Sequence, residues 1–189
     1  MRVRYNSPTV LTFSLLCVLV QLVSIFSRMV AMRYFAVSGT IMWSWPLDWF
    51  RMFSHVLGHA SWQHLTANLA LILLLGPLLE EKYGSSRMLI MILCTAFVVA
   101  LLNAIFFDTG LYGASSIVFM MIGLNSVVGL RHGDIPLTLA LVALIYVGGE
   151  MLSGFRNDGI SHSAHLFGAA TGSAFGYLWK TGASDDLRP

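Results

Sequence analysis

The sequence predicts an all-α membrane protein, built as a bundle of six transmembrane helices. Of its 189 residues, 57% are hydrophobic and only 11% are charged. A soluble domain of this size usually carries about a quarter charged residues, so too few charges are present here to cover a water-facing surface. The apolar residues also run continuously instead of alternating, which argues against the strands of a β-barrel.

Six segments are apolar enough to cross the bilayer core, which is about 30 Å thick and takes about 20 helical residues. They are 8–27, 64–80, 88–107, 113–130, 135–152 and 161–179. The first, third and sixth are the clearest. The second and fifth are short and are bounded by Glu80 and Glu150, so they could be buried in the bundle rather than face lipid. The first is too long for the apolar region of a secretory signal, and Pro8 suits a helix start.

The charges of the loops predict the orientation. With the N-terminus in the cytoplasm, seven basic residues lie inside and four outside. The inside residues are Arg2, Arg4, Lys82, Arg87, Arg131, Lys180 and Arg188, and the outside ones are Arg28, Arg33, Arg51 and Arg156. We therefore expect a multi-pass protein of a bacterial or archaeal plasma membrane with both termini cytoplasmic. Residues 1–7 form the N-terminus, 8–180 the membrane domain and 181–189 a polar tail.

The segment 28–63 is the longest stretch that does not span the membrane. It contains Trp43, Trp45, Trp49 and Trp62 and little charge. Tryptophans of this kind commonly lie at the level of the lipid headgroups. Two interpretations stay open, a partly immersed amphipathic loop and an ordinary exposed loop. The basic residues of the whole chain are scattered, so nothing indicates binding to nucleic acid.

Ser115 opens the fourth predicted helix, in the run Gly113-Ala114-Ser115-Ser116. A serine at this position is commonly no more than a helix cap. However, the glycine two residues earlier allows a tight turn from loop into helix. Such a turn could expose the hydroxyl group and direct backbone N–H groups at a developing oxyanion.

His165 lies in the otherwise apolar sixth predicted helix. Gly168, Gly172 and Gly176 follow at offsets of three, seven and eleven, which puts them on the same helical face. A stripe of small residues lets another membrane helix come close, so we expect His165 to be pressed against a neighbour. It could hydrogen-bond a backbone carbonyl there, or activate a serine hydroxyl as its base.

His64 and Asn68 are four residues apart at the start of the second predicted helix, and therefore share one face. Both can donate hydrogen bonds, as an oxyanion hole requires, although they could equally form a structural pair. The predicted topology places His64, Asn68, Ser115 and His165 at a similar depth near the outer face. A hydrolytic site supplied with water from that face requires this arrangement, whereas independent structural roles do not.

These residues resemble the motifs of the rhomboid proteases, and the resemblance extends from about Trp49 to Trp179 with the same number of helices. Gly113 and Ser115 fit the nucleophile motif Gly-x-Ser-Gly. The run from Ala164 to Gly172 fits Ala-His-x-x-Gly-x-x-x-Gly, and the run from His64 to Asn68 fits His-x-x-x-Asn. The segment Arg51–His59 is similar to the family's loop after the first helix.

The resemblance implies a rhomboid-like fold and a two-residue Ser115–His165 dyad without an acidic third member. His64, Asn68 and the backbone N–H of Ser115 would hold the oxyanion. Arg51 and Glu80 would be structural, and Gly84 would close the second helix beside Glu80. His55 and His59 would shape the loop or retain water.

Two positions depart from the family pattern. Ser116 stands where glycine is usual, and Phe119 stands where tyrosine is common. Ser116 adds a second candidate hydroxyl beside the oxyanion site, but Ser115 keeps the two-residue offset from Gly113. Phe119 lies one helical turn after Ser115, so its ring can still pack against His165.

The resulting hypothesis is a serine endopeptidase that cleaves membrane-protein substrates near the outer membrane face, in segments with small or helix-breaking residues. It needs no metal and no organic cofactor. Five histidines at the predicted outer face (His55, His59, His64, His162 and His165) could suggest a zinc site, but the run His-Glu-x-x-His of zinc metalloproteases is missing. A non-catalytic rhomboid-like protein that binds membrane clients remains the alternative, and a transporter is disfavoured by the absence of repeated halves. A compact rhombosortase-like subtype is also open.

Overall fold

The protein is described by a computed structural model over residues 5–107, 109–131, 137, 140–142, 144, 145, 148 and 162–179. Its helices in chain order are α1 (Pro8–Phe26), α2 (Arg28–Phe35), α3 (Pro46–Ser54), the short 3-10 helix η1 (His55–Leu57), α4 (Trp62–Tyr83), α5 (Ser85–Phe106), α6 (Ser115–Arg131) and α8 (His162–Leu178). The only β-type pairing in these ranges is a bridge between Val37 and Leu111. The prediction of an all-α helical bundle is therefore confirmed.

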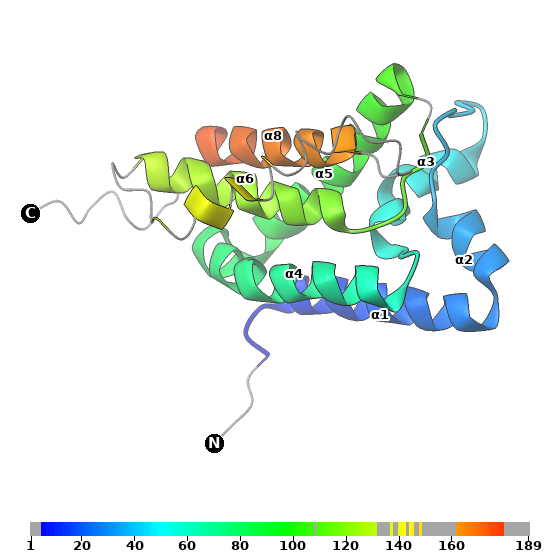
Figure 1. The fold of residues 1–189 in the computed structure, drawn as a ribbon, viewed down its shortest axis with the longest axis horizontal. Helices are drawn as coiled ribbons and strands as arrows, with labels where there is room; N and C mark the ends of the chain where they lie inside the picture. The colour runs from blue at the N-terminus through cyan, green and yellow to red at the C-terminus, as the bar shows by residue number, and fades with distance from the viewer. Residues whose placement is uncertain are drawn as a thin grey trace, which may run out of the picture.

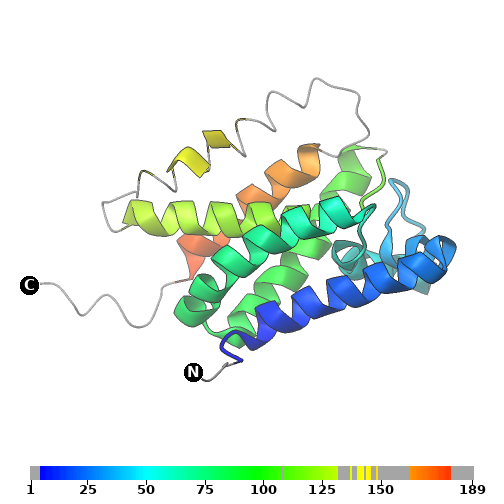
Figure 2. The ribbon, with the colours of Figure 1, turned by 60° about the horizontal axis from the view of Figure 1, so that its bottom comes forward.

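The long helices run in two opposite directions. Helices α4, α6 and α8 begin at one end of the bundle, and α1 and α5 run the other way (Figure 1). Helix α4 lies between α1 and α6 (Figure 2), and it contacts both. The segments 27–61 and 107–114 therefore gather at the end where α4, α6 and α8 begin, which is where the predicted site residues lie in the sequence.

The ends of α4 follow from local chemistry. Ser61 caps its start, because the Ser61 hydroxyl accepts the backbone N–H of His64 at 3.1 Å. Gly84 ends it with a φ of +86°, a conformation that favours glycine. The helix is consequently longer than the predicted span 64–80, and Glu80 lies inside it. The Glu80 carboxylate accepts the N–H groups of Thr9 and Val10 at 2.9 and 2.8 Å, and so caps the start of α1.

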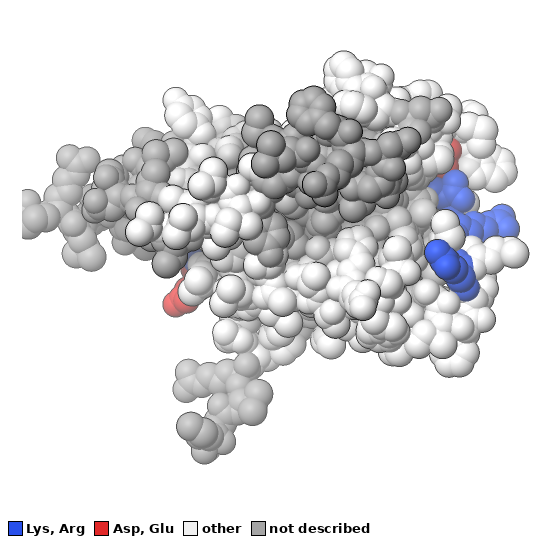
Figure 3. Space-filling view, viewed as in Figure 1, with Lys and Arg blue, Asp and Glu red and all other residues white. Residues whose placement is uncertain are grey.

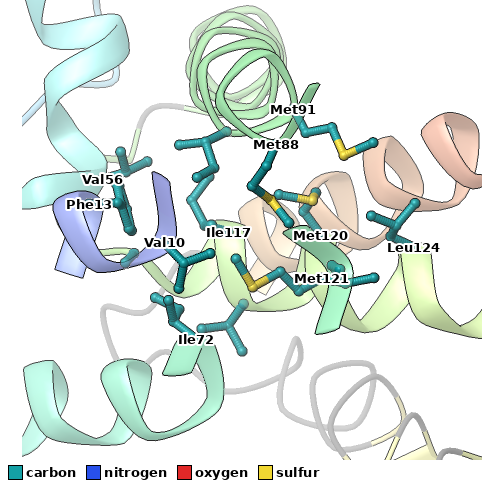
Figure 4. Packing of buried hydrophobic residues seen from close by; sticks show 14 of the residues in the cluster. Val10, Phe13, Val56, Ile72, Met88, Met91, Ile117, Met120, Met121 and Leu124 are labelled. Atoms are coloured by element: carbon teal, nitrogen blue, oxygen red, sulfur yellow. The ribbon is translucent and has the colours of Figure 1, made fainter. Parts of the chain in front are cut away.

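Helix α6 occupies the centre of the bundle, against α4, α5 and α8. Every residue from Ser116 to Leu124 is buried. Figure 4 shows Ile117, Met120, Met121 and Leu124 packing against side chains of α1, α4 and α5. The expectation that the second predicted span could be buried was wrong for α4, where Leu73, Leu74 and Leu78 are exposed. A surrounded helix and a lipid-facing helix are equally apolar, so hydropathy did not separate them.

Within the described ranges, three helices are long and apolar enough to cross a membrane: Pro8–Phe26, Trp62–Tyr83 and Ser85–Phe106. The fourth predicted span corresponds to α6, whose apolar part Ser115–Val127 is shorter. The sixth, predicted as one of the clearest spans, corresponds to α8, which has 17 residues. The fifth, 135–152, falls largely outside the described residues, as does the tail 181–189. The count of six spans therefore stays a prediction.

The segment 28–63 contains two helices, α2 and α3, that the sequence analysis did not assign. Its tryptophans Trp43, Trp45, Trp49 and Trp62 are all exposed. In the described part of the face in Figure 3, Lys and Arg side chains gather mainly at the end that carries α2 and α3. Arg51 is structural, as the family resemblance implied: it donates to the Arg33 carbonyl and to the Asp48 carboxylate, both at 2.7 Å.

Candidate active site

Ser115 and His165 come together where α6 and α8 begin. Ser115 is the first residue of α6, and His165 is the fourth residue of α8. The Nε2 atom of His165 lies 2.7 Å from the Oγ atom of Ser115. The serine is half-buried, and the histidine is buried with 9% of its surface exposed. The geometry places an imidazole nitrogen within hydrogen-bond reach of a hydroxyl group, as the activation of a serine requires.

The predicted glycine stripe is what lets α8 approach α6. A Cβ atom added to Gly168 would collide with the backbone of Ser116, and one added to Gly172 would collide with the backbone of Met120. Helix α6 contributes Gly123, where an added Cβ would collide with the backbone of Ala169. Close contact between membrane helices depends on such small residues. The stripe therefore sets the distance between the helices that carry Ser115 and His165.

Phe119 fixes one face of the His165 ring. The two rings are stacked, with centroids 4.7 Å apart and planes 5° apart. Phe119 is 4% exposed. The ring of His162 meets His165 edge-on at 6.4 Å. The expectation that Phe119 can pack against His165 without a tyrosine hydroxyl agrees with this arrangement.

The segment that leads into Ser115 is held by three successive contacts with the segment 37–59. Leu111 pairs with Val37 through two backbone hydrogen bonds of 2.9 and 3.1 Å. The N–H of Gly113 donates to the carbonyl of His55 at 3.0 Å. The N–H of Ala114 donates to Nε2 of His59 at 3.3 Å. In the sequence only Gly113 indicated this turn. The support from His55 and His59 could not be predicted, because each of these contacts uses a backbone N–H of a distant segment.

Gly113 is required at its position for two reasons. Its φ is +153°, in the range where side chains are disfavoured. A Cβ atom there would also lie 2.6 Å from Cε1 of His64. The half-buried His64 ring therefore packs directly on the turn before Ser115, and it also meets the His59 ring edge-on at 5.1 Å. The structure thus places His64 at the nucleophile turn.

Asn68 and Ser116 are buried side chains whose polar atoms are not used among the described residues. The amide nitrogen of Asn68 has no hydrogen-bond partner there, and neither has the hydroxyl of Ser116. Asn68 therefore keeps a free donor one helical turn after His64, but it does not bond to the Ser115–His165 pair. Ser116 is only 2% exposed, so of the two adjacent hydroxyl groups only that of Ser115 is partly accessible and bonded to His165.

The two buried histidines of the adjoining loop are neutral at neutral pH. Burial lowers the pKa of His55 to about 4, against the opposing effect of its hydrogen bond with the Ala96 carbonyl. Burial also lowers the pKa of His59 to about 4, with a further contribution from the nearby His64. Burial raises the pKa of Tyr112 in the same loop region. In the part of the chain that the structure describes, no three His, Cys, Asp or Glu side chains are grouped so as to hold a metal ion.

Comparison with known proteins gives a family and a relative. The family model described as the rhomboid domain matches residues 46–181, a range that contains His64, Asn68, Ser115 and His165. The "Putative rhomboid protease YdcA" of Bacillus subtilis (strain 168) is 29% identical over 146 residues, which covers 69% of this chain and 67% of that protein.

Proposed function

The chain belongs to the rhomboid family of intramembrane proteases, and from this premise we propose that it is a serine endopeptidase in which Ser115 is the nucleophile and His165 the base. It is an integral membrane protein, and its substrates are membrane proteins. The observation that carries the proposal is the 2.7 Å contact between Nε2 of His165 and Oγ of Ser115. The alternative of a protein that only binds clients offers no reason for this contact.

In the proposed reaction, Ser115 Oγ attacks the carbonyl carbon of a substrate peptide while His165 Nε2 accepts the hydroxyl proton. The tetrahedral intermediate collapses when the C–N bond breaks, and His165 returns the proton to the leaving amine. A water molecule then attacks the ester carbonyl carbon while His165 accepts its proton, and His165 returns that proton to Ser115 Oγ as the ester C–O bond breaks and the new carboxyl end leaves. The stacking of the His165 ring on Phe119 supports this mechanism, because it holds the imidazole in one plane while the ring accepts and then returns the proton.

We assign the oxyanion to three donors. The first N–H groups of a helix have no intrahelical partner, and Ser115 is the first residue of α6. The N–H groups of Gly113 and Ala114 are already bonded to His55 and His59, so the Ser115 N–H is the backbone donor of the turn. The unpaired amide nitrogen of Asn68 and the ring of His64 complete the set.

The substrate follows from the physics of the bilayer. A membrane helix has its backbone groups paired, so a scissile carbonyl becomes accessible only where the helix unwinds. We therefore propose that cleavage occurs at small or helix-breaking residues, near the membrane face at which α4, α6 and α8 begin. With the predicted charge bias of the loops, that face is the outer one and both termini are cytoplasmic.

The proposal is tested by incubating the purified protein with a single-span substrate that carries a glycine-rich segment at the membrane face. We expect cleavage by the native protein and by Ser116→Ala, and none by Ser115→Ala or His165→Ala. Residual activity after loss of a triad member is about a thousandth or less of normal in serine proteases. Cleavage by Ser115→Ala at the native rate would exclude this nucleophile, and a native protein that binds the substrate without cutting it would favour the client-binding alternative.

A further inference from the structure

His59 is buried, with 1% of its surface exposed, and both of its ring nitrogens are engaged. Nδ1 lies 3.3 Å from the carbonyl oxygen of Leu57, and Nε2 lies 3.3 Å from the backbone nitrogen of Ala114. No reaction step proposed above uses this side chain. Its partner Ala114 is nevertheless the residue directly before the proposed nucleophile.

The two partners of His59 determine which tautomer it adopts. A carbonyl oxygen can only accept, so Nδ1 must carry the proton that is donated to Leu57. A backbone N–H can only donate, so Nε2 must be unprotonated to accept from Ala114. The ring is therefore neutral with its hydrogen on Nδ1, and a second proton on Nε2 would abolish the bond to Ala114. Burial and the neighbouring His64 both disfavour that second proton, in agreement with the pKa of about 4.

We propose that His59 is a positioning residue of the proteolytic reaction: by accepting the N–H of Ala114 it fixes the Gly113–Ala114 peptide plane, and so the conformation of Ala114 from which the chain enters Ser115. This inference rests on the proposed role of Ser115. Rotation of the Ala114 peptide changes the backbone directly before Ser115, and so alters the direction of its N–H. It would also free the Ala114 N–H, which His59 otherwise keeps out of the oxyanion site.

The position of Ala114 matters because its neighbours are already fixed. The N–H groups of Leu111 and Gly113 donate to the backbone carbonyls of Val37 and His55. The N–H of Ala114 instead donates to a side chain 55 residues away in the sequence. Of these contacts, the bond between Ala114 and His59 is the one made by a side chain, so it can be removed by substituting that side chain.

Two substitutions separate a positioning role from general structural support. A glutamine side chain reaches about as far as Nε2 of histidine, so the amide oxygen in His59→Gln can accept from Ala114. An asparagine reaches only as far as Nδ1, so His59→Asn can still donate to Leu57 but cannot reach Ala114. A displacement of about 1 Å in a catalytic site costs up to about 100-fold in rate. We expect kcat of His59→Asn to fall about 10- to 100-fold with KM little changed, and His59→Gln to restore kcat.

Two measurements on the native protein make the inference testable without any variant. Nitrogen-15 NMR of the His59 ring should show the proton on Nδ1, and hydrogen exchange should show a protected Ala114 amide. A proton on Nε2 or a rapidly exchanging Ala114 amide would overturn the inference. Equal losses of kcat in His59→Asn and His59→Gln would also overturn it, as would an unchanged kcat in His59→Asn. Cleavage by Ser115→Ala, by contrast, removes the nucleophile assignment and leaves the NMR and exchange results standing, so the two failures are distinguishable.

Discussion

The ring of Phe119 is stacked on the imidazole of His165, with the ring centroids 4.7 Å apart and the planes 5° apart. The stack needs only a flat ring, and we expect Phe119→Tyr to keep cleavage within a factor of about three of the native rate. Phe119→Ala removes the stacking partner and leaves a cavity, so kcat should fall about 10- to 100-fold. The variants are compared by initial cleavage rates per folded molecule, because the cavity costs about 3–5 kcal/mol of stability. Equal rates for Phe119→Ala and the native protein would show that the stack does not orient His165.

Gly168 sets the separation of α6 and α8 one helical turn after His165. An added Cβ would lie 3.1 Å from Cα of Ser116 and collide with its carbonyl oxygen. Gly168→Ala should therefore destabilise the protein by about 1–3 kcal/mol and lengthen the Ser115–His165 contact, with a loss of activity larger than the loss of folded protein. Ala170→Val on the exposed face of the same helix is the matched control. Thermal unfolding and cleavage rates check both, and equal effects of the two substitutions would contradict the role of the glycine stripe.

Glu80, in α4, caps the start of a different helix, α1. Its two carboxylate oxygens accept the N–H groups of Thr9 and Val10, about 70 residues earlier in the sequence. Glu80→Gln replaces one of these acceptor oxygens by an amide NH2 group, which can only donate, so stability should fall by about 1–2 kcal/mol while cleavage per folded molecule stays unchanged. The neighbouring Glu81 is exposed, and Glu81→Gln serves as the control. Calorimetric unfolding in detergent compares the two. A Glu80→Gln protein as stable as Glu81→Gln would exclude the cap as a source of stability.

His55 and His59 make stability depend on pH. Their pKa values of about 4 lie below the ordinary value of 6.5, so the unfolded chain binds more protons than the folded protein between these limits. The stability that the two neutral histidines contribute is complete above pH 6.5 and is lost as the pH falls toward 4. At pH 5 the free energy of unfolding has fallen by on the order of 2 kcal/mol for each histidine. Thermal unfolding of Ser115→Ala between pH 7.5 and 5 measures this without self-cleavage. Adding His59→Gln should make the decline shallower; an unchanged slope would show that His59 does not titrate in this way.

Motif spacings in the sequence indicated Ser115, His165 and His64, and the structure brings these residues together near the helix starts. The glycines after His165 likewise indicated a close helix contact. Such patterns are local, so they can be recognised without knowledge of the fold. The short helices α2 and α3 were not predicted, because they depend on distant contacts. One example is the hydrogen bond from the Ser54 hydroxyl to the Tyr34 carbonyl at 2.6 Å.

The central place of α6 and the support of the nucleophile turn were also beyond sequence reasoning. Hydropathy reports how apolar a helix is, but it does not report whether lipid or protein surrounds the helix, so α4 rather than α6 was considered for burial. The bond from Ala114 to His59 joins residues 55 positions apart and uses a backbone N–H, which leaves no trace in residue identity.

The most direct test of the account is covalent labelling with a fluorophosphonate, followed by mass-spectrometric identification of the modified residue. Because His165 activates Ser115, the reagent should react with Ser115, and the adduct should disappear in His165→Ala. Without its base, a serine hydroxyl is too weak a nucleophile to attack phosphorus at a measurable rate. Ser116→Ala should label as the native protein does. An adduct on Ser116, or undiminished labelling of Ser115 in His165→Ala, would contradict the claim that the 2.7 Å contact between these two side chains is the catalytic one.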